Sequence, residues 1–264
     1  MTMSSSILLA ALVLSAPPAA EPWTPGVQES IALVATNLMP HALAAQMIRH
    51  IDSLRAGALS PYRNAEEPVE YHALHADGRF GLASRKVEQQ VTKIVSMLEG
   101  HAPFEDVVFE FGVLSHYVAD VSWPLATSDA DEREPSYAAD MAGYVEHNLA
   151  KFPAVFYGYY PFQSRAFSLQ DYLRDTAQGA NRFYPLISQS YYPKAGGRMV
   201  SSRSFDDKSP AFGIAQISYN RAVSAVANVW LHAWRESHGD LAGLGSATRY
   251  LSELPETSAA QRQR

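Results

Sequence analysis

The chain has 264 residues, of which 47% are hydrophobic and 18% are charged, and its formal net charge is −6. This length and composition allow a substantial core, which excludes disorder as the main state, and the acidic balance argues against binding nucleic acid through a broad basic face. The absence of cysteine excludes disulfide scaffolds, thiolate metal sites and cysteine nucleophiles. Any bound metal must therefore have nitrogen and oxygen ligands.

The N-terminus has the layout of a secretory signal peptide. An apolar run at 7–14 is followed by small residues up to Ala20, and this order favours cleavage near Ala20. The run is too short for a permanent anchor, and no later stretch is long and apolar enough for a transmembrane helix. We therefore expect a signal peptide over 1–20, an exported (periplasmic or secreted) helical domain over 21–240, and a polar tail over 241–264.

Apolar residues recur with helical spacing along most of the chain, and no alternating run predicts a strand. The sequence therefore predicts an all-α fold, a single multi-helix bundle. The first helical region covers 27–54 and contains Pro40, which predicts a kink or a break. Further helices are expected over 82–98, 104–121, 137–151, from Ser168 to about Ile187, and over 212–234. Ser168 followed by Asp171 resembles a helix-capping box.

Three segments between the predicted helices contain side chains that could contact a ligand. The stretch 62–80 has no helical period and contains His72 and His75, and a long ordered loop in a compact domain favours a site. The loop 128–135 is acidic, which is typical of a solvated surface. The stretch 156–162 is aromatic, and we expect it to cover the bundle rather than to contact lipid or stack on a base.

The predicted helix 104–121 is apolar on every side, which places it in the centre of the bundle. It nevertheless contains His116 and Asp120, which are one turn apart and project from the same face. An imidazole and a carboxylate in this arrangement can bind one cation, or they can satisfy each other as buried polar groups. Gly112, one turn earlier, leaves room on this face for a neighbouring backbone.

The segment GVLSHYVADVSWPL at 112–125 resembles the signature of the zinc-dependent phospholipase C and S1/P1 nuclease superfamily, in which a buried helix carries His-x-x-x-Asp followed by Pro. Further similar elements occur in the same order: Trp23 before GVQES, LRAGALSP at 54–61, YHALHADG at 71–78 and YVEHNL at 144–149. The resemblance implies an all-α fold and a trinuclear zinc site that activates a water for attack on a phosphodiester.

Transferred residue by residue, the resemblance implies that His72, His116 and Asp120 are metal ligands. The other ligand positions hold different residues, namely Tyr62, Ser30, Ala126, and either Ala138 and Ala142 or Ser136 and Asp140. Trp23 would bind metal through its amine only if cleavage occurred directly before it, so we expect it to be a packing residue. Most of a trinuclear cage is therefore missing, and at most a reduced site with one zinc ion is expected.

Three hypotheses remain open for this site. In the first, the three residues above bind one zinc or other divalent ion together with water, and His75 or Asp77 could add a ligand. In the second, the fold persists without metal, and His116 and Asp120 form a buried hydrogen-bonded pair. In the third, acidic residues of 129–134 replace the missing ligands. The first predicts a phosphoric ester hydrolase that prefers phospholipid to nucleic acid, and the second a binding or interaction module.

Overall fold

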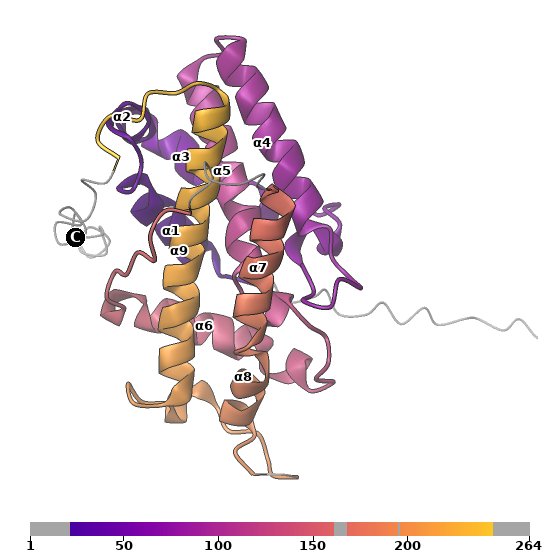
Figure 1. Ribbon diagram of the computed structural model, residues 1–264. Helices are drawn as coiled ribbons and strands as arrows, with labels where there is room; N and C mark the ends of the chain where they lie inside the picture. Colours follow the sequence, from indigo (N-terminus) through magenta and orange to yellow (C-terminus); the bar gives the residue numbers. More distant parts are fainter. Residues whose placement is uncertain (1–21, 161–167, 195, 245–264) are drawn as a thin grey trace, which may run out of the picture.

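The computed structural model describes residues 22–160, 168–194 and 196–244, and these ranges contain helices and no strands (Figure 1). The prediction of an all-α fold is therefore confirmed. None of the described helices is both long enough and apolar enough to cross a membrane. The α-helices are α1 (Pro25–Thr36), α2 (His41–Arg49), α3 (Ile51–Ala58), α4 (Ala83–Glu99), α5 (Phe104–Val121), α6 (Ala138–Asn148), α7 (Leu169–Asn181), α8 (Tyr184–Tyr191) and α9 (Pro210–Glu236).

Two regions predicted as single helices are divided in the structure. The region 27–54 breaks before Pro40, as predicted, because proline cannot continue a helix. It breaks again at His50, whose φ of −111° and ψ of 39° are not helical. The region after Ser168 breaks between α7 and α8, where Pro185 lies in the first turn of α8. The apolar period continues through each break, so periodicity alone does not reveal the breaks at His50 and before Pro185.

Helix α5 lies at the centre of the bundle, as its apolar sequence predicts, and every residue from 114 to 121 is buried. Helices α1, α3, α4 and α9 pack around it (Figure 1). Its contact with α3 is made by backbone, because a Cβ atom at Gly112 would lie 2.2 Å from the carbonyl oxygen of Leu54, and one at Gly57 would lie 2.0 Å from that of Phe109. Glycine at both positions is required for this approach.

The segment 153–160 runs along α9 (Figure 1) and is fixed there by polar side chains one helical turn apart. Asn220 Oδ1, Ser224 Oγ and Asn228 Oδ1 accept hydrogen bonds of 2.9, 3.1 and 2.7 Å from the backbone N–H groups of Val155, Tyr157 and Tyr160, respectively. The described part of the predicted aromatic stretch therefore covers the bundle, as expected. Residues 161 and 162 of that stretch lie outside the described residues.

The expectation that the acidic loop 128–135 is simply solvated is wrong for two of its carboxylates. Asp131 accepts hydrogen bonds from the hydroxyls of Ser188 and Tyr137, and Tyr184 Oη donates to Glu134 Oε2 at 2.6 Å. Ser188 and Tyr184 belong to α8, so the loop docks on that helix. The hydroxyl groups of α8 stabilise the two carboxylates by donating hydrogen bonds to them. The pattern of charges along the sequence does not reveal these hydroxyl partners.

The first residues of the predicted polar tail are packed. Trp234 Nε1 donates to the carbonyl oxygen of Asp240 at 2.8 Å. The backbone N–H of His41 donates to the carbonyl oxygen of Ala242 at 2.9 Å. The tail residues Leu241 and Leu244 also pack against the core. The rest of the tail and the predicted signal peptide lie outside the described residues.

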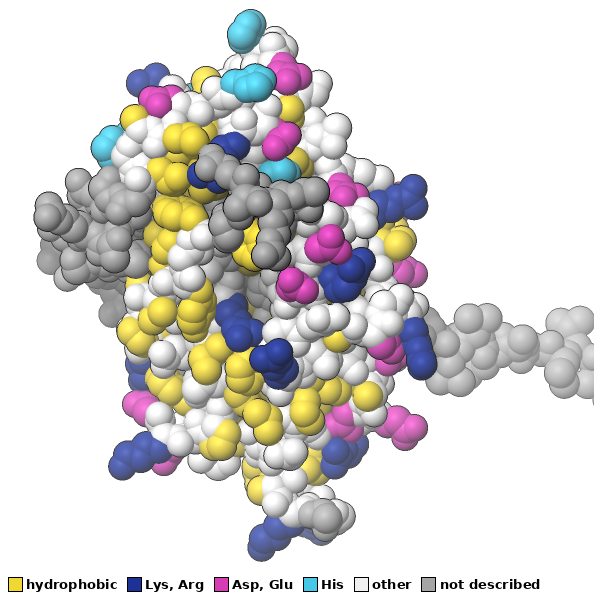
Figure 2. All heavy atoms as spheres, viewed as in Figure 1, with side chains coloured by type: hydrophobic (Ala, Val, Ile, Leu, Met, Phe, Trp, Pro, Cys, Tyr) yellow, Lys and Arg dark blue, Asp and Glu magenta, His cyan; other side chains and the backbone are white. Residues whose placement is uncertain are grey.

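The face of the molecule seen in Figure 2 mixes charges of both signs with hydrophobic side chains. No continuous basic area forms among the described residues on this face. This arrangement agrees with the net charge of −6.

Candidate metal centre

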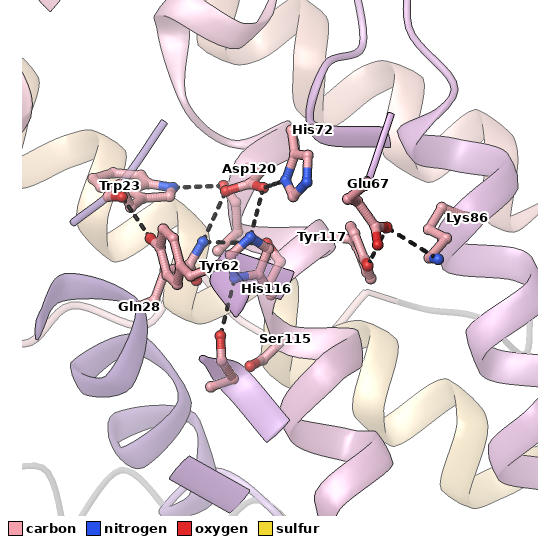
Figure 3. A network of polar contacts seen from close by, with 12 residues as sticks. Trp23, Gln28, Tyr62, Glu67, His72, Lys86, Ser115, His116, Tyr117 and Asp120 are labelled. Atoms are coloured by element: carbon pink, nitrogen blue, oxygen red, sulfur yellow. Dashed lines mark hydrogen bonds and ion pairs between the residues drawn. The ribbon is translucent and has the colours of Figure 1, made fainter. Parts of the chain in front are cut away.

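Three side chains that the sequence analysis singled out lie together in the structure (Figure 3). His116 and Asp120 project from α5, and His72 is the last residue of the 3₁₀ helix Val69–His72. One ligand atom from each residue lies within 4.8 Å of the others. In the part of the chain that the structure describes, no other three His, Asp or Glu residues meet this condition.

Helix α3 fixes the orientation of His116. Nδ1 of His116 lies 2.9 Å from the carbonyl oxygen of Ala58, so this nitrogen carries a proton and donates it. The contact exists because Gly57 and Gly112 allow the two backbones to touch. Burial lowers the pKa of His116 and favours the neutral ring. Nε2 then has a free lone pair, and it is buried without a hydrogen-bond partner.

Asp120 is a buried carboxylate surrounded by neutral donors and imidazoles. Its Oδ1 accepts a hydrogen bond of 2.8 Å from Gln28 Nε2, and its Oδ2 lies 2.8 Å from His72 Nδ1 and 3.4 Å from His116 Nε2. Within the described ranges, neither lysine nor arginine forms an ion pair with it. A buried carboxylate is costly without a compensating charge, so this position favours a bound cation.

The donor set fits a divalent metal. Imidazole nitrogens and carboxylate oxygens are zinc ligands, and two ligand atoms of a tetrahedral zinc ion are about 3.4 Å apart when each bond is about 2.1 Å. His116 Nε2 and Asp120 Oδ2 have this separation of 3.4 Å. The contact of 2.8 Å between His72 and Asp120 is instead a hydrogen bond, which metal binding would replace. The residues present therefore fit one ion.

Tyr62 and Trp23 occupy positions that the resemblance assigns to metal ligands, but here they bind each other. Tyr62 Oη donates to the backbone carbonyl oxygen of Trp23 at 2.5 Å, and the tyrosine ring makes an edge contact with His116 at 4.9 Å between centroids. Trp23 is fully buried, and its indole N–H donates to the carbonyl oxygen of Ala119. It packs in the core, as predicted, and its carbonyl group is satisfied without metal.

Gln28 is the site residue that the sequence analysis missed. It lies on α1, is fully buried, and donates to Asp120, while its Oε1 has no hydrogen-bond partner. Ser30, where the resemblance places a ligand, instead contacts the hydroxyl of Tyr219 at 2.8 Å. The available signal was a polar residue on the apolar face of a predicted helix, next to Val27 and one turn before Ile31.

A clamp formed by Glu67, Tyr117 and Lys86 adjoins the site (Figure 3). The Tyr117 ring lies 5.5 Å from the ring of His72 and 5.6 Å from that of His116. Tyr117 Oη donates to Glu67 at 2.6 Å, and Lys86 Nζ lies 3.1 Å from the same carboxylate. Burial raises the pKa of Glu67, but the hydrogen bonds from Tyr117 and Lys86 outweigh this effect and bring the pKa below its usual value. The clamp ties the loop that carries His72 to α4 and α5.

The structure does not bring the two additional candidate ligands into the group. Nδ1 of His75 lies 3.9 Å from Asp129 Oδ1, and its ring packs on Phe80. Asp77 is half-exposed and faces Arg79. Among the described residues, the acidic side chains of 129–134 do not join the group either, and the carboxylates of residues 131 and 134 contact α8.

The other alternative ligand positions also lie elsewhere. Asp140 accepts hydrogen bonds from the backbone N–H and the hydroxyl of Ser202, and Ser136 contacts the hydroxyl of Tyr192 at 3.1 Å. These residues therefore help to fix the loops around α6 and α8. The described candidates for a metal site remain His72, His116 and Asp120.

No family model and no curated protein sequence matches the chain. Among solved structures, it is similar to the alpha toxin from Clostridium absonum, with a TM-score of 0.63, 13% identity, and coverage of 83% of this chain and 67% of the toxin. The alpha-toxin from the avian strain SWCP of Clostridium perfringens gives a TM-score of 0.58, 11% identity, and coverage of 84% and 66%. The chain thus spans about two thirds of each toxin and has the all-helical alpha-toxin fold.

Proposed function

We propose that the protein is an exported, metal-dependent hydrolase of phosphoric esters, with one divalent ion, zinc, bound by His72, His116 and Asp120. The observation that carries the proposal is the buried Nε2 of His116, which has no hydrogen-bond partner and faces a carboxylate that no lysine or arginine of the described residues pairs with. The alpha-toxin fold and the resemblance around the HxxxD element support the reaction class. A phospholipid is the substrate that the resemblance implies.

The chain itself prepares this site for a metal. The carbonyl oxygen of Ala58 holds Nδ1 of His116 and so selects Nε2 as the ligand atom. Asp120 supplies negative charge from a position without solvent exposure. A divalent metal in such a site lowers the pKa of a bound water and stabilises charge on phosphoryl oxygens.

Access to the site is from the side of His72. Its side chain is 11% exposed, whereas those of His116 and Asp120 are fully buried. Trp23 and Tyr62 close the inner side with aromatic rings, which exclude bulk water from the carboxylate. A substrate phosphate would therefore approach past the end of the 3₁₀ helix Val69–His72.

The first test is the metal content of protein purified without chelator, measured by elemental mass spectrometry. We expect about one zinc ion per chain and a lower melting temperature after EDTA treatment, because a metal that binds only the folded state stabilises it. The variant His116→Ala should contain no zinc, whereas the control His75→Ala, a buried histidine outside the group, should retain it. Less than about a tenth of an equivalent of zinc per chain, with no effect of EDTA on the melting temperature, would contradict the metal hypothesis.

The second test is hydrolysis. Bis(p-nitrophenyl) phosphate and phosphatidylcholine vesicles should both be hydrolysed by the zinc-loaded protein, and His116→Ala should remove the activity. A protein that binds zinc but hydrolyses neither probe would contradict the enzymatic proposal while leaving the metal site intact.

One observation favours a second candidate, a binding or interaction module with the same fold. The two oxygens of Asp120 already accept hydrogen bonds from Gln28 and His72, so the folded site does not depend on metal. In this case zinc titration monitored by calorimetry should show no saturable binding, and His116→Ala should change only stability.

A further inference from the structure

A cavity of about 520 Å³ lies between the segment 157–160, α7 and α9. This volume is typical of a small-molecule site. The cavity contains no residue of the metal centre, so it is a separate feature of the molecule. Its walls include Tyr157, Tyr160, Tyr172, Asp175, Arg221 and Ser224.

The cation of this cavity, Arg221, is held in place but has no charged partner among the described residues. Its guanidinium lies 5.3 Å from the centroid of the Phe183 ring, and a Cβ atom at position 179 would lie only 2.7 Å from its Nη1. Gly179 therefore leaves room for the guanidinium to rest on α7. Arg221 makes no ion pair or hydrogen bond with the rest of the described chain. A guanidinium in this state is suited to a carboxylate or a phosphate.

The anion of the cavity, Asp175, lies on α7 one turn before Gly179 and so on the same face of the helix. It also makes no ion pair or hydrogen bond with the described residues. The two opposite charges thus line one cavity without neutralising each other. The ligand that complements both is a molecule with one positive and one negative group.

The tyrosines form a fixed aromatic wall. Tyr157 and Tyr160 are 55% and 37% exposed, and the ring of Tyr160 makes an edge contact with Tyr172 at 5.2 Å between centroids. Their backbone N–H groups are bound by Ser224 and Asn228, so the wall exists before a ligand arrives. Aromatic faces attract ammonium groups, and cages of aromatic side chains recognise quaternary ammonium ligands.

We propose that this cavity binds a small zwitterionic molecule. Its ammonium group lies against the tyrosine wall and Asp175, and its anionic group is bound by Arg221. The anion is a carboxylate or a phosphate, since a guanidinium pairs with either.

Isothermal titration calorimetry with zinc-free protein tests the proposal. The probes are glycine betaine and phosphocholine, which share a trimethylammonium group and differ in the anion, together with choline chloride and sodium phosphate, which each supply only one charge. At least one zwitterion should bind about tenfold more tightly than either single-charge probe. The stronger zwitterion identifies the anion. Absence of zwitterion binding at millimolar concentration, or equal binding of choline, would overturn the proposal.

Variants locate the binding. Arg221→Gln and Asp175→Asn should each weaken the zwitterion about tenfold, while melting temperatures stay close to that of the wild type. Arg174→Gln and Asp171→Asn are matched controls, because these residues pair with each other on α7 and do not line the cavity. His116→Ala should leave the affinity unchanged. Loss of binding in His116→Ala with full binding in Arg221→Gln would place the ligand in the metal centre and contradict the proposal.

Discussion

Two clusters around buried or half-buried carboxylates differ in how the negative charge is compensated. In the docked loop, Asp131 faces the guanidinium of Arg133, with 2.8 Å from Nε to Oδ1, and accepts hydrogen bonds from Ser188 and Tyr137. The Arg133 guanidinium holds the pKa of Asp131 well below its ordinary value. This carboxylate has its cation within the chain, so its role is to fix the loop on α8.

At the metal centre no lysine or arginine of the described residues pairs with the carboxylate. Asp120 has Gln28 on one oxygen and two imidazoles on the other, and the closer contact, with His72, is a hydrogen bond. The comparison teaches that burial of a carboxylate alone does not mark a binding site. What distinguishes this site is that no described lysine or arginine pairs with its carboxylate, and that the buried Nε2 of His116 next to it has no hydrogen-bond partner.

The largest expected effect comes from exchanging the two carboxylates for amides. Asp120→Asn should weaken zinc binding by at least roughly a hundredfold, because the charged ligand is lost. Without metal its melting temperature should be equal to or above that of the wild type, since an uncompensated buried charge is removed. Asp131→Asn should show the reverse pattern, with unchanged zinc affinity and a lower melting temperature. Calorimetry and thermal melts measure both, and identical behaviour of the two variants would remove the distinction between the clusters.

The backbone contact that orients His116 can be broken from α5. In Gly112→Ala the new methyl group meets the carbonyl oxygen of Leu54, and we expect a loss of about 1–3 kcal/mol in the free energy of unfolding together with weaker zinc binding. Gly143→Ala is the control, because nothing lies within 4 Å of its Cβ position on α6, and it should be neutral or stabilising. Urea denaturation measures both. An unchanged stability of Gly112→Ala would contradict the close backbone packing.

The docked loop should respond to pH through Glu134. Burial raises the pKa of Glu134 to about 7 from the ordinary value of 4.5. The folded state therefore binds the Glu134 proton more tightly than the unfolded state does. The contribution of this proton to the stability of the fold is complete below about pH 4.5 and is lost as the pH rises through about 7. Between pH 5 and 8 the free energy of unfolding of the wild type should fall by on the order of 2 kcal/mol relative to that of Glu134→Gln, which has no titrating carboxyl at this position. Parallel stability profiles of the two proteins would show that Glu134 titrates normally.

The smallest expected effect concerns the clamp beside the metal centre. Glu67→Gln removes the charge that holds Lys86 and loosens the hydrogen bond with Tyr117, so the loop carrying His72 is less well fixed. We expect about tenfold weaker zinc binding, since groups that support metal ligands have effects of this size. Glu66→Gln is the matched control, because Glu66 is the residue next to Glu67 and its side chain is exposed. Equal zinc affinity of both variants would show that the clamp has only a structural role.

Much of the fold could be predicted from the sequence because the signals are local. Apolar residues that recur every three or four positions predict the helices, and Pro40 predicts the break between α1 and α2. The N-terminal cap of α7 is also confirmed, since the backbone N–H of Asp171 donates to Ser168 Oγ. The break at His50 has no such signal, and the division of α7 from α8 was missed although Pro185 marks it.

The candidate site was predictable in part for the same reason. The spacing of His116 and Asp120 places both on one face of one helix, whatever the rest of the chain does. Gln28, the Ala58 carbonyl and the contact between Tyr62 and Trp23 come from segments that meet only in the folded protein. The docking of Asp131 and Glu134 on α8 depends likewise on residues more than 40 positions away.

By itself, the sequence determined that the chain is all-helical, that one apolar helix lies at its centre, and that any metal ligands are nitrogen and oxygen atoms. These follow from periodicity, composition and the lack of cysteine, none of which requires knowledge of neighbours in space. Only the tertiary structure decided which polar groups compensate which charge. Asp131 and Asp120 are the same residue type and each has a partner close in sequence, Arg133 and His116. Packing brings the partners that are distant in sequence, Ser188 of α8 to Asp131 and His72 and Gln28 to Asp120.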